Sequence, residues 1–205
     1  MLKNLLAAAI CVVSCRTVPD RQTAWTGRAV YFEIGDSCVV TISPRDGHRD
    51  TLDVSTAYKK IVCMSSTHVA CLSALGRQAD IVGVNGLRYI SDPEVRLSDS
   101  VSDTGDLDFE KVISIRPDLL VASGDGMTDY SRLIPFGIRV IHLYDYMEHH
   151  PLARAEYVRL FGALTGCLPQ ADSVFAEVSA RYERLSAMAV QAGSRPSVLL
   201  NAPYG

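Results

Sequence analysis

A short stretch of the chain, CMSSTHVACLSALG at residues 63–76, brings together side chains that are capable of chemistry. Ser65 or Ser66 with His68 would give a hydroxyl nucleophile and its base, as in hydrolases. Such a nucleophile also needs a third, orienting group, and the G-x-S-x-G turn that exposes the serine of many hydrolases is missing. We therefore do not assign hydrolase chemistry to this stretch.

The same stretch offers three zinc ligands in Cys63, His68 and Cys71. A zinc site needs ligands that converge on one point. Cys63 lies in an expected strand and Cys71 lies one turn inside the helix that follows, so their side chains point in different directions and we expect no metal site. Neither these two cysteines nor Cys38 and Cys167 show CxxC spacing. The sequence therefore does not decide whether these four cysteines form disulfides or are buried free thiols.

A third interpretation is a polar loop that faces a ligand. Ser65, Ser66, Thr67 and His68 lie between an apolar strand and an apolar helix, so their hydroxyls, amides and imidazole meet at the N-terminus of that helix. A structural role competes with this one, because the hydroxyl of Ser66 or Thr67 can cap the helix and stabilise it by ~1 kcal/mol. The two roles are compatible.

A second loop, GDGMTD at 124–129, follows an expected strand and precedes a short helix. Asp145 lies about 20 residues beyond Gly124, close to the spacing at which a dinucleotide fold places its ribose-binding acid. However, Asp129 occupies the place of the third glycine, and the loop follows the third strand of the unit rather than the first. An α/β enzyme that binds a nucleotide cofactor through this loop is therefore the alternative hypothesis.

The run Glu148, His149 and His150 stands directly in front of an expected helix. Adjacent histidines on a loop are more often solvated than bound to a metal, so we assign no metal to this run. His48 in a polar loop and His142 in a strand receive no role.

The elements that would position these residues follow from the spacing of apolar side chains. Two β-rich runs flank a Gly35-Asp36 turn, which predicts a β-hairpin extension within residues 28–57. From residue 58 short apolar strands alternate with helices, which predicts an α/β fold with a parallel sheet covered by helices and with ligands at the carboxyl ends of its strands. The expected strands are 60–64, 80–84, 118–122 and 138–143. The expected helices are 67–76, 108–117, 128–137, 151–166 and 168–192.

The composition is that of a soluble globular protein. The chain has 205 residues, of which 48% are apolar and 21% charged, with a net charge of −3. No basic excess points to nucleic acid. The polar segment 85–106 is expected to be a functional or disordered loop, and a further strand is expected at 197–201.

The N-terminus, MLKNLLAAAICVVSC, has the features of a lipoprotein signal peptide. Lys3 supplies a positive charge, an apolar run follows, and Cys15 comes directly after small residues. We predict a signal peptide at 1–14, lipidation of Cys15 and a tether at 15–27. Acyl chains on Cys15 would hold the protein at a membrane surface without spanning it.

Four segments, taken in order, resemble one protein family. They are KKIVCMSSTHVACLSALG, IVGVNGLRYISDP, DFEKVISIRPDLLVASG and HHPLARAEYVRLFGALTG. They are similar to the Fe³⁺-siderophore/cobalamin periplasmic binding domain, the class III substrate-binding proteins of ABC importers, and most of all to its lipoprotein members. The resemblance covers residues 58–201.

This resemblance implies two α/β lobes that are joined by one long rigid helix and clamp a ligand between them. It assigns 58–166 to the N-terminal ligand-binding lobe, 168–192 to the spine helix and 196–205 to the first strand of a C-terminal lobe. The rest of that lobe is absent from this sequence, so the expected second lobe is truncated.

The ends of the expected parallel strands gather a set of polar and aromatic residues at one edge, where the ligand is expected. They are Ser65, Ser66, Thr67, His68, Arg88, Tyr89, Gly124, Asp125, Tyr144 and Tyr146. Arg88 suits a carboxylate or phosphate of the ligand. Tyr89 can stack on a flat ring or offer a phenolate to haem iron, and His68 is the second candidate axial ligand, although capping or packing explains it nearly as well.

The resemblance further implies a partner. Glu110 matches the position at which the N-terminal lobe of the family carries an acid that docks onto arginines of the permease. Its competing role is that of a first-turn helix acid favoured by the helix dipole.

The sequence therefore predicts a binding protein rather than an enzyme, exported to the periplasm or cell surface and anchored by lipid. It would capture an iron-siderophore, haem or cobalamin-type ligand and deliver it to an ABC permease. We expect no catalytic residue, no resident cofactor and no nucleic acid partner. A third hypothesis is a surface lipoprotein that holds haem or metal without a permease.

Overall fold

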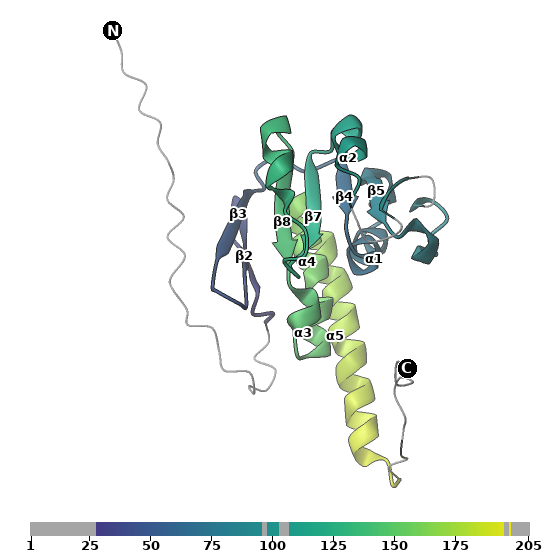
Figure 1. The fold of residues 1–205 in the computed structure, drawn as a ribbon. Helices are drawn as coiled ribbons and strands as arrows, with labels where there is room; N and C mark the ends of the chain where they lie inside the picture. Colours follow the sequence, from purple (N-terminus) through teal and green to yellow (C-terminus); the bar gives the residue numbers. More distant parts are fainter. Residues whose placement is uncertain (1–27, 96–97, 103–106, 195–196, 198–205) are drawn as a thin grey trace.

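The computed structural model describes residues 28–95, 98–102, 107–194 and 197 (Figure 1). The predicted signal peptide, Cys15 and the tether lie outside the described residues, as does nearly all of the strand predicted at 197–201.

A parallel five-stranded sheet forms the centre of the molecule, as predicted, with the strand order β6-β5-β4-β7-β8. Its strands are β4 (Ile61–Cys63), β5 (Ile81–Asn85), β6 (Asp99–Ser102), β7 (Leu119–Ser123) and β8 (Arg139–Leu143). All the strands run in one direction, so their carboxyl ends lie at one edge and their amino ends at the other. We call these the carboxyl edge and the amino edge.

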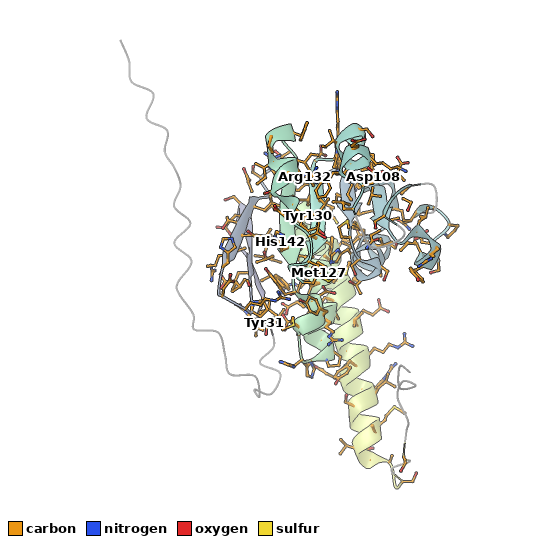
Figure 2. All side chains as sticks on the ribbon, viewed as in Figure 1. Tyr31, Asp108, Met127, Tyr130, Arg132 and His142 are labelled. Carbon is orange, nitrogen blue, oxygen red and sulfur yellow. The ribbon has the colours of Figure 1, made fainter. Side chains whose placement is uncertain are left out.

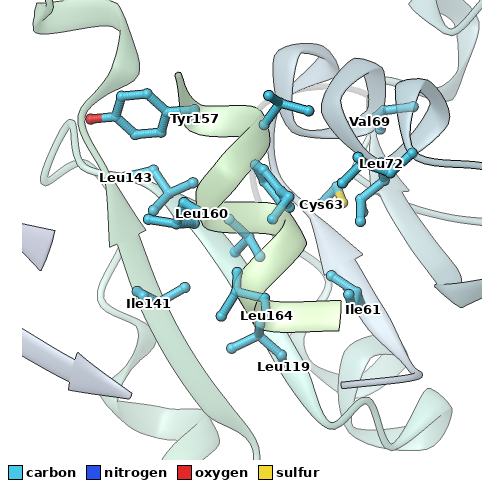
Figure 3. Packing of buried hydrophobic residues seen from close by; sticks show 14 of the residues in the cluster. Ile61, Cys63, Val69, Leu72, Leu119, Ile141, Leu143, Tyr157, Leu160 and Leu164 are labelled. Atoms are coloured by element: carbon cyan, nitrogen blue, oxygen red, sulfur yellow. The ribbon is translucent and has the colours of Figure 1, made fainter. Parts of the chain in front are cut away.

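Helices cover both faces of this sheet, because its central strands are apolar on both sides. On one face α1 (Ser66–Ala74) and α4 (Tyr157–Thr165) pack on β4, β7 and β8 (Figure 3). On the other face α2 (Phe109–Ile115) and the 3₁₀ helix η4 (Tyr130–Phe136) bury Val112 and Leu133. The prediction of a helix at 128–137 is thus confirmed in place but not in type, since Pro135 lies inside this tighter helix.

The segment predicted to be one helix at 151–166 is divided, so that prediction is wrong in part. The structure has α3 (Pro151–Ala155) followed by α4, with Glu156 between them. The turn tightens at this junction, where the amide of Arg159 donates to the carbonyl of Glu156 at 2.9 Å, an i→i+3 bond.

The long helix α5 (Leu168–Gln191) agrees with the predicted spine helix. Its first turns pack on α4 around Gly162, where a Cβ would stand 2.4 Å from the Cβ of Ala171. Beyond this contact α5 extends well past the sheet, and Leu185 and Met188 in its second half are exposed (Figure 1). None of the helices within the described residues combines the length and apolar character needed to cross a bilayer.

A second, antiparallel sheet precedes the lobe. It has the order β1-β2-β3, from β1 (Phe32–Ile34), β2 (Cys38–Ile42) and β3 (Arg49–Asp53). The predicted hairpin corresponds to β1 and β2, whereas β3 was not predicted. The sheet lies beside β8 (Figure 1), and we call it the small sheet.

Buried carboxylates attach the start of the small sheet to the lobe. Glu148 accepts hydrogen bonds from the amides of Val30 (2.9 Å) and Tyr31 (3.2 Å), and Glu156 accepts one from the amide of Ala29. Both glutamates are almost fully buried. Burial raises the pKa of Glu148, which the two amide bonds oppose and the nearby Glu156 carboxylate reinforces.

The segment 85–106 contains more regular structure than predicted. Its described part includes the 3₁₀ helix η2 (Leu87–Tyr89) and the edge strand β6. The backbone of Gly86 has a φ of +67°, a left-handed conformation in which glycine turns the chain out of β5 and into η2.

Candidate functional site

Four loops follow the strands at the carboxyl edge, and we call them the carboxyl-edge loops. They are residues 64–68 after β4, 86–90 after β5, 124–129 after β7 and 144–147 after β8. The sheet order therefore brings every residue of the predicted ligand face to one edge. Figure 2 shows Met127, of the third loop, and Tyr31, just before β1, toward the α3 end of the lobe, with Asp108 and Arg132 toward the other end.

The loop after β4 is tied to the loop after β8. Ser65 caps α1, accepting from the amide of Thr67 at 3.3 Å, so the prediction that Ser66 or Thr67 forms the cap is wrong by one or two residues. The Thr67 hydroxyl donates to Asp145 Oδ2 at 2.9 Å. Because β7 lies between β4 and β8, this bond passes over the end of β7 and holds the two loops together.

His68 is buried and is not exposed at the carboxyl edge. Its ring is 1% exposed and lies 5.7 Å from the ring of Phe161 on α4. Its Nε2 lies 3.8 Å from Asp145 Oδ1, too far for a hydrogen bond. The pKa of Asp145 is lowered: burial raises it, but the contact with His68 and the hydrogen bond from Thr67 lower it by more. Packing thus explains His68 better than a role as an axial ligand.

Arg88 and Tyr89 are exposed on η2. The Arg88 guanidinium carbon lies 4.6 Å from the centroid of the Tyr89 ring, and Tyr89 is 70% exposed. This stacking leaves the edge of the guanidinium open for a planar anion.

Two tyrosines follow β8 in different environments. Tyr144 is buried and covers Gly124 so closely that a Cβ there would stand 2.1 Å from a ring carbon. Tyr146 is 42% exposed, and its hydroxyl donates to the Gly124 carbonyl at 3.3 Å. The Asp125 carboxylate accepts from the amide of Met127 at 2.9 Å. Of this group, Tyr146 and the exposed Met127 have the open apolar area that a large ligand requires.

In the structure, the residues considered for a nucleotide site or a metal site make other contacts. Asp145, the ribose acid of the nucleotide hypothesis, is already bonded to Thr67. Glu148 is used by backbone amides, and His150 caps α3 by accepting from the amide of Leu152 at 3.1 Å. Within the part of the chain that the structure describes, no three metal-binding side chains come together.

The described cysteines are free thiols. Burial raises the pKa of the Cys63 thiol, and it raises that of Cys71 to about 12. Both thiols stay protonated near neutral pH, a form that neither reacts nor binds zinc readily.

Glu110, the predicted docking acid, lies exposed in the first turn of α2, outside the carboxyl-edge loops. The neighbouring cap is Asp108, which accepts from the amide of Lys111 at 2.9 Å. Glu110 is therefore not needed as the cap of this helix.

A cavity of about 620 Å³ lies at the amino edge, where Lys60, Ile81 and Asp99 line it. The Lys60 ammonium donates to the carbonyls of Ile115 and Arg116 at 2.7 and 2.8 Å, so it is hydrogen-bonded to the C-terminus of α2. We place the candidate site at the carboxyl edge, because the exposed Arg88 and the exposed aromatic rings lie there.

The small sheet adds residues that the sequence did not reveal. Its loop 43–48 joins β2 to β3 and reaches the carboxyl edge, where the Ser43 side chain is near enough to Tyr144 to lower that tyrosine's pKa against the effect of burial, and Arg45 lies against Gly126. A hairpin loop so far from the strand ends in sequence gives no signal of this contact.

Sequence and structure comparisons agree on one family. The sequence model of a family described as periplasmic binding protein matches residues 61–205. An uncharacterized lipoprotein of Methanocaldococcus jannaschii is 26% identical over 139 residues, which are 61% of this chain and 34% of that protein.

Solved structures share the fold. A periplasmic binding protein from Veillonella parvula has a TM-score of 0.58 at 18% identity, covering 74% of this chain and 53% of that one. A periplasmic haem-binding protein from Pseudomonas aeruginosa has a TM-score of 0.55 at 22% identity, covering 63% of this chain and 46% of that one. This chain thus spans about half the length of these solved proteins and about a third of the curated relative.

Proposed function

Because this chain belongs to the periplasmic binding protein family, we propose that it is the receptor lobe of an ABC importer for an iron-siderophore, haem or cobalamin-type ligand. The observation that supports this most directly is the grouping of exposed Arg88, Tyr89, Met127 and Tyr146 on loops of one sheet edge. An arginine among exposed rings suits a large, flat or chelated ligand with an anionic group.

The family and its solved neighbours are binding proteins, and the site agrees with that class. Ser65 caps α1 and the candidate base His68 is buried, while Asp145, the candidate ribose-binding acid, binds Thr67. The ligand would therefore be held without covalent chemistry.

The experiment is native mass spectrometry of the full chain after incubation with a mixture of ferric siderophores, haem and cobalamin. We expect one of them to be retained at a stoichiometry of one. Retention of NAD in a parallel incubation, with none of the chelates bound in the first, would favour the nucleotide-binding alternative.

Arg88 provides a sharper test of where the ligand lies. Arg88→Ala should weaken affinity by about 2 kcal/mol, since it leaves an anionic group of the ligand unpaired. Arg139→Ala is the matched control, because Arg139 lies 5.9 Å over the Tyr58 ring at the amino edge. Isothermal titration that finds no change for Arg88→Ala combined with Tyr89→Ala would place the ligand elsewhere.

We also propose that Glu110 docks onto the permease. Glu110→Lys should leave ligand affinity nearly intact and reduce transport in cells, because an exposed charge mainly sets encounter and register with a partner. Glu177→Lys, the same change on exposed α5, is the control. Lost ligand binding with normal permease association would contradict the assignment.

Membrane attachment is the last part of the proposal. Cleavage after residue 14 would expose Cys15 for lipidation, and the lipoprotein relative supports this expectation. Cys15→Ser should abolish incorporation of labelled palmitate. Unchanged labelling would rule out an anchor at this residue.

A further inference from the structure

The small sheet lies outside the segment that matches the family, yet it is fixed against the lobe. The family match begins at residue 61, whereas the small sheet ends at Asp53. His142 Nδ1 on β8 lies 2.9 Å from Asp50 Oδ2 on β3, and the ring of Phe32 packs on that of Tyr157 at 4.7 Å. The loop 43–48 therefore has a defined position relative to the carboxyl edge.

Local hydrogen bonds give this loop a compact form. The amide of Ser43 donates to the carbonyl of His48 at 2.8 Å, and the amide of Gly47 donates to the carbonyl of Ser43 at 3.0 Å. The Ser43 hydroxyl accepts from the amide of Arg45 at 3.3 Å. Arg45 is thus presented from a closed turn rather than from an extended, freely moving segment.

The side chain of Arg45 reaches across to the loop after β7. A Cβ on Gly126 would stand 2.9 Å from Arg45 Nη1, so only a glycine lets the guanidinium lie so close to that backbone. The Ser43 side chain of the same turn lies close to Tyr144 of the lobe, whose pKa it lowers against the effect of burial. Two separate contacts therefore bring this turn to the carboxyl edge.

The guanidinium of Arg45 is exposed and, among the described residues, forms no ion pair. The acids of the two loops are held by backbone amides, since Asp46 accepts from the amide of His48 at 3.1 Å and Asp125 accepts from the amide of Met127 at 2.9 Å, and neither is paired with Arg45. Arg49, on the same small sheet, is instead paired with Glu33 at 2.9 Å. Arg45 thus presents a cation that the fold does not neutralise.

We infer that Arg45 is a specificity-determining residue that binds an anionic group, a carboxylate or phosphate, of the ligand held at the carboxyl edge. The inference rests on the proposed function and extends it, because it adds a residue from outside the family segment. Arg88 follows β5 and Arg45 lies at the loop after β7, so the two cations stand on either side of the loop after β4. The ends of β5 and β7, from which these positions are reached, are two strand spacings apart, roughly 10 Å. The arrangement favours anionic chelates over cationic ones.

The test is isothermal titration of the full chain with three probes: haem, ferric dicitrate and ferrioxamine B. The first two have anionic carboxylates, and the third is a cationic chelate. Arg45→Ala should weaken binding of an anionic probe about tenfold, since a hydrogen-bonded ionic contact is lost. Arg45→Lys should recover part of this loss, because it keeps the charge without the planar fork. Arg49→Ala, which removes the same charge from the small sheet, should leave affinity unchanged.

Several outcomes would overturn the inference. Unchanged affinity of Arg45→Ala for an anionic probe would do so, as would an equal loss in Arg49→Ala, which indicates a general charge effect. Binding of ferrioxamine B alone would overturn the inference and leave the proposed function standing. Binding of none of the probes by the unmodified chain would overturn the inference, and would count against the proposed function as well if cobalamin, titrated in parallel, also failed to bind.

Discussion

The five-stranded sheet and the small sheet are stabilised in different ways. β4 and β7 of the five-stranded sheet pack through fully buried apolar side chains. The small sheet also depends on carboxylates, which accept hydrogen bonds from its backbone or form ion pairs with the lobe. Ile61–Cys63 and Leu119–Ala122 have no exposed surface, while β3 buries only Leu52. Apolar burial stabilises without fixing a direction, but a hydrogen bond to a carboxylate fixes both partners. The lobe thus gains stability from its core, and the small sheet gains a defined position.

Leu119→Ala should show the largest effect. Leu119 lies in the core near Leu164 of α4 (Figure 3), and truncation leaves a cavity that should lower the free energy of unfolding by about 2–5 kcal/mol. Urea denaturation followed by circular dichroism measures this. Leu185→Ala, at an exposed position of α5, should change stability by less than about 0.5 kcal/mol. Similar losses in both variants would contradict a stability that resides in the core.

Glu148→Ala tests the polar side of the comparison. Two amides, the part-buried one of Val30 and the buried one of Tyr31, lose their acceptor, which should cost about 2–3 kcal/mol. Hydrogen exchange should show faster exchange at these amides while the amides of β7 stay protected. Glu148→Gln keeps an acceptor oxygen and should be milder. Equal deprotection of both sheets would mean that they unfold as one unit.

Gly124→Ala extends the comparison to the carboxyl edge, where the ring of Tyr144 packs directly on Gly124. The added methyl group would overlap the ring of Tyr144, so we expect a loss of about 1–3 kcal/mol in thermal unfolding. Gly193→Ala is the control, since a Cβ there meets no atom within 4 Å. A neutral effect of Gly124→Ala would show that Tyr144 moves freely.

Asp50→Asn should have the smallest effect, about 1 kcal/mol near neutral pH. The pKa of Asp50 is lowered, chiefly by its hydrogen bond with His142, against the effect of burial. The folded state therefore binds this proton more weakly than the unfolded state, so the contribution is present above a pH of about 4 and is lost as the pH falls further. Denaturation at pH 6 and pH 3 should show the variant and the original chain converging at the lower pH. A gap that stays constant would contradict the ionic origin of the contribution.

The spacing of apolar residues and the positions of glycine and proline, which end helices and strands, were sufficient to predict most of the lobe. β4 and β7 are continuous apolar runs, and α5 has a helical period that ends before Gly193. β3, with the sequence RDTLD, and β6, with DSVS, were not predicted because they are polar edge strands that bury few side chains, unlike the more apolar edge strand β8. Edge strands are defined by their partners, which a local pattern does not include.

The candidate site was predictable only at the level of its loops. A common strand direction follows from the alternation of strands and helices, so the loops of Ser65, Arg88, Gly124 and Tyr146 could be expected to share an edge. Which side chains face outward could not, because His68 turns inward to Phe161 through tertiary packing. Contacts with the small sheet join residues far apart in the chain and leave no trace in local spacing.

The amides of Ala29, Val30 and Tyr31 have a mechanical consequence. A pull on the chain ahead of residue 28 strains their bonds to Glu148 and Glu156 before it reaches the ladder of β1. Glu148 directly follows the loop that contains Tyr146, so the tension enters the lobe beside the proposed ligand. In a chain anchored at Cys15, as we propose, tension on the tether would therefore act on the lobe next to Tyr146.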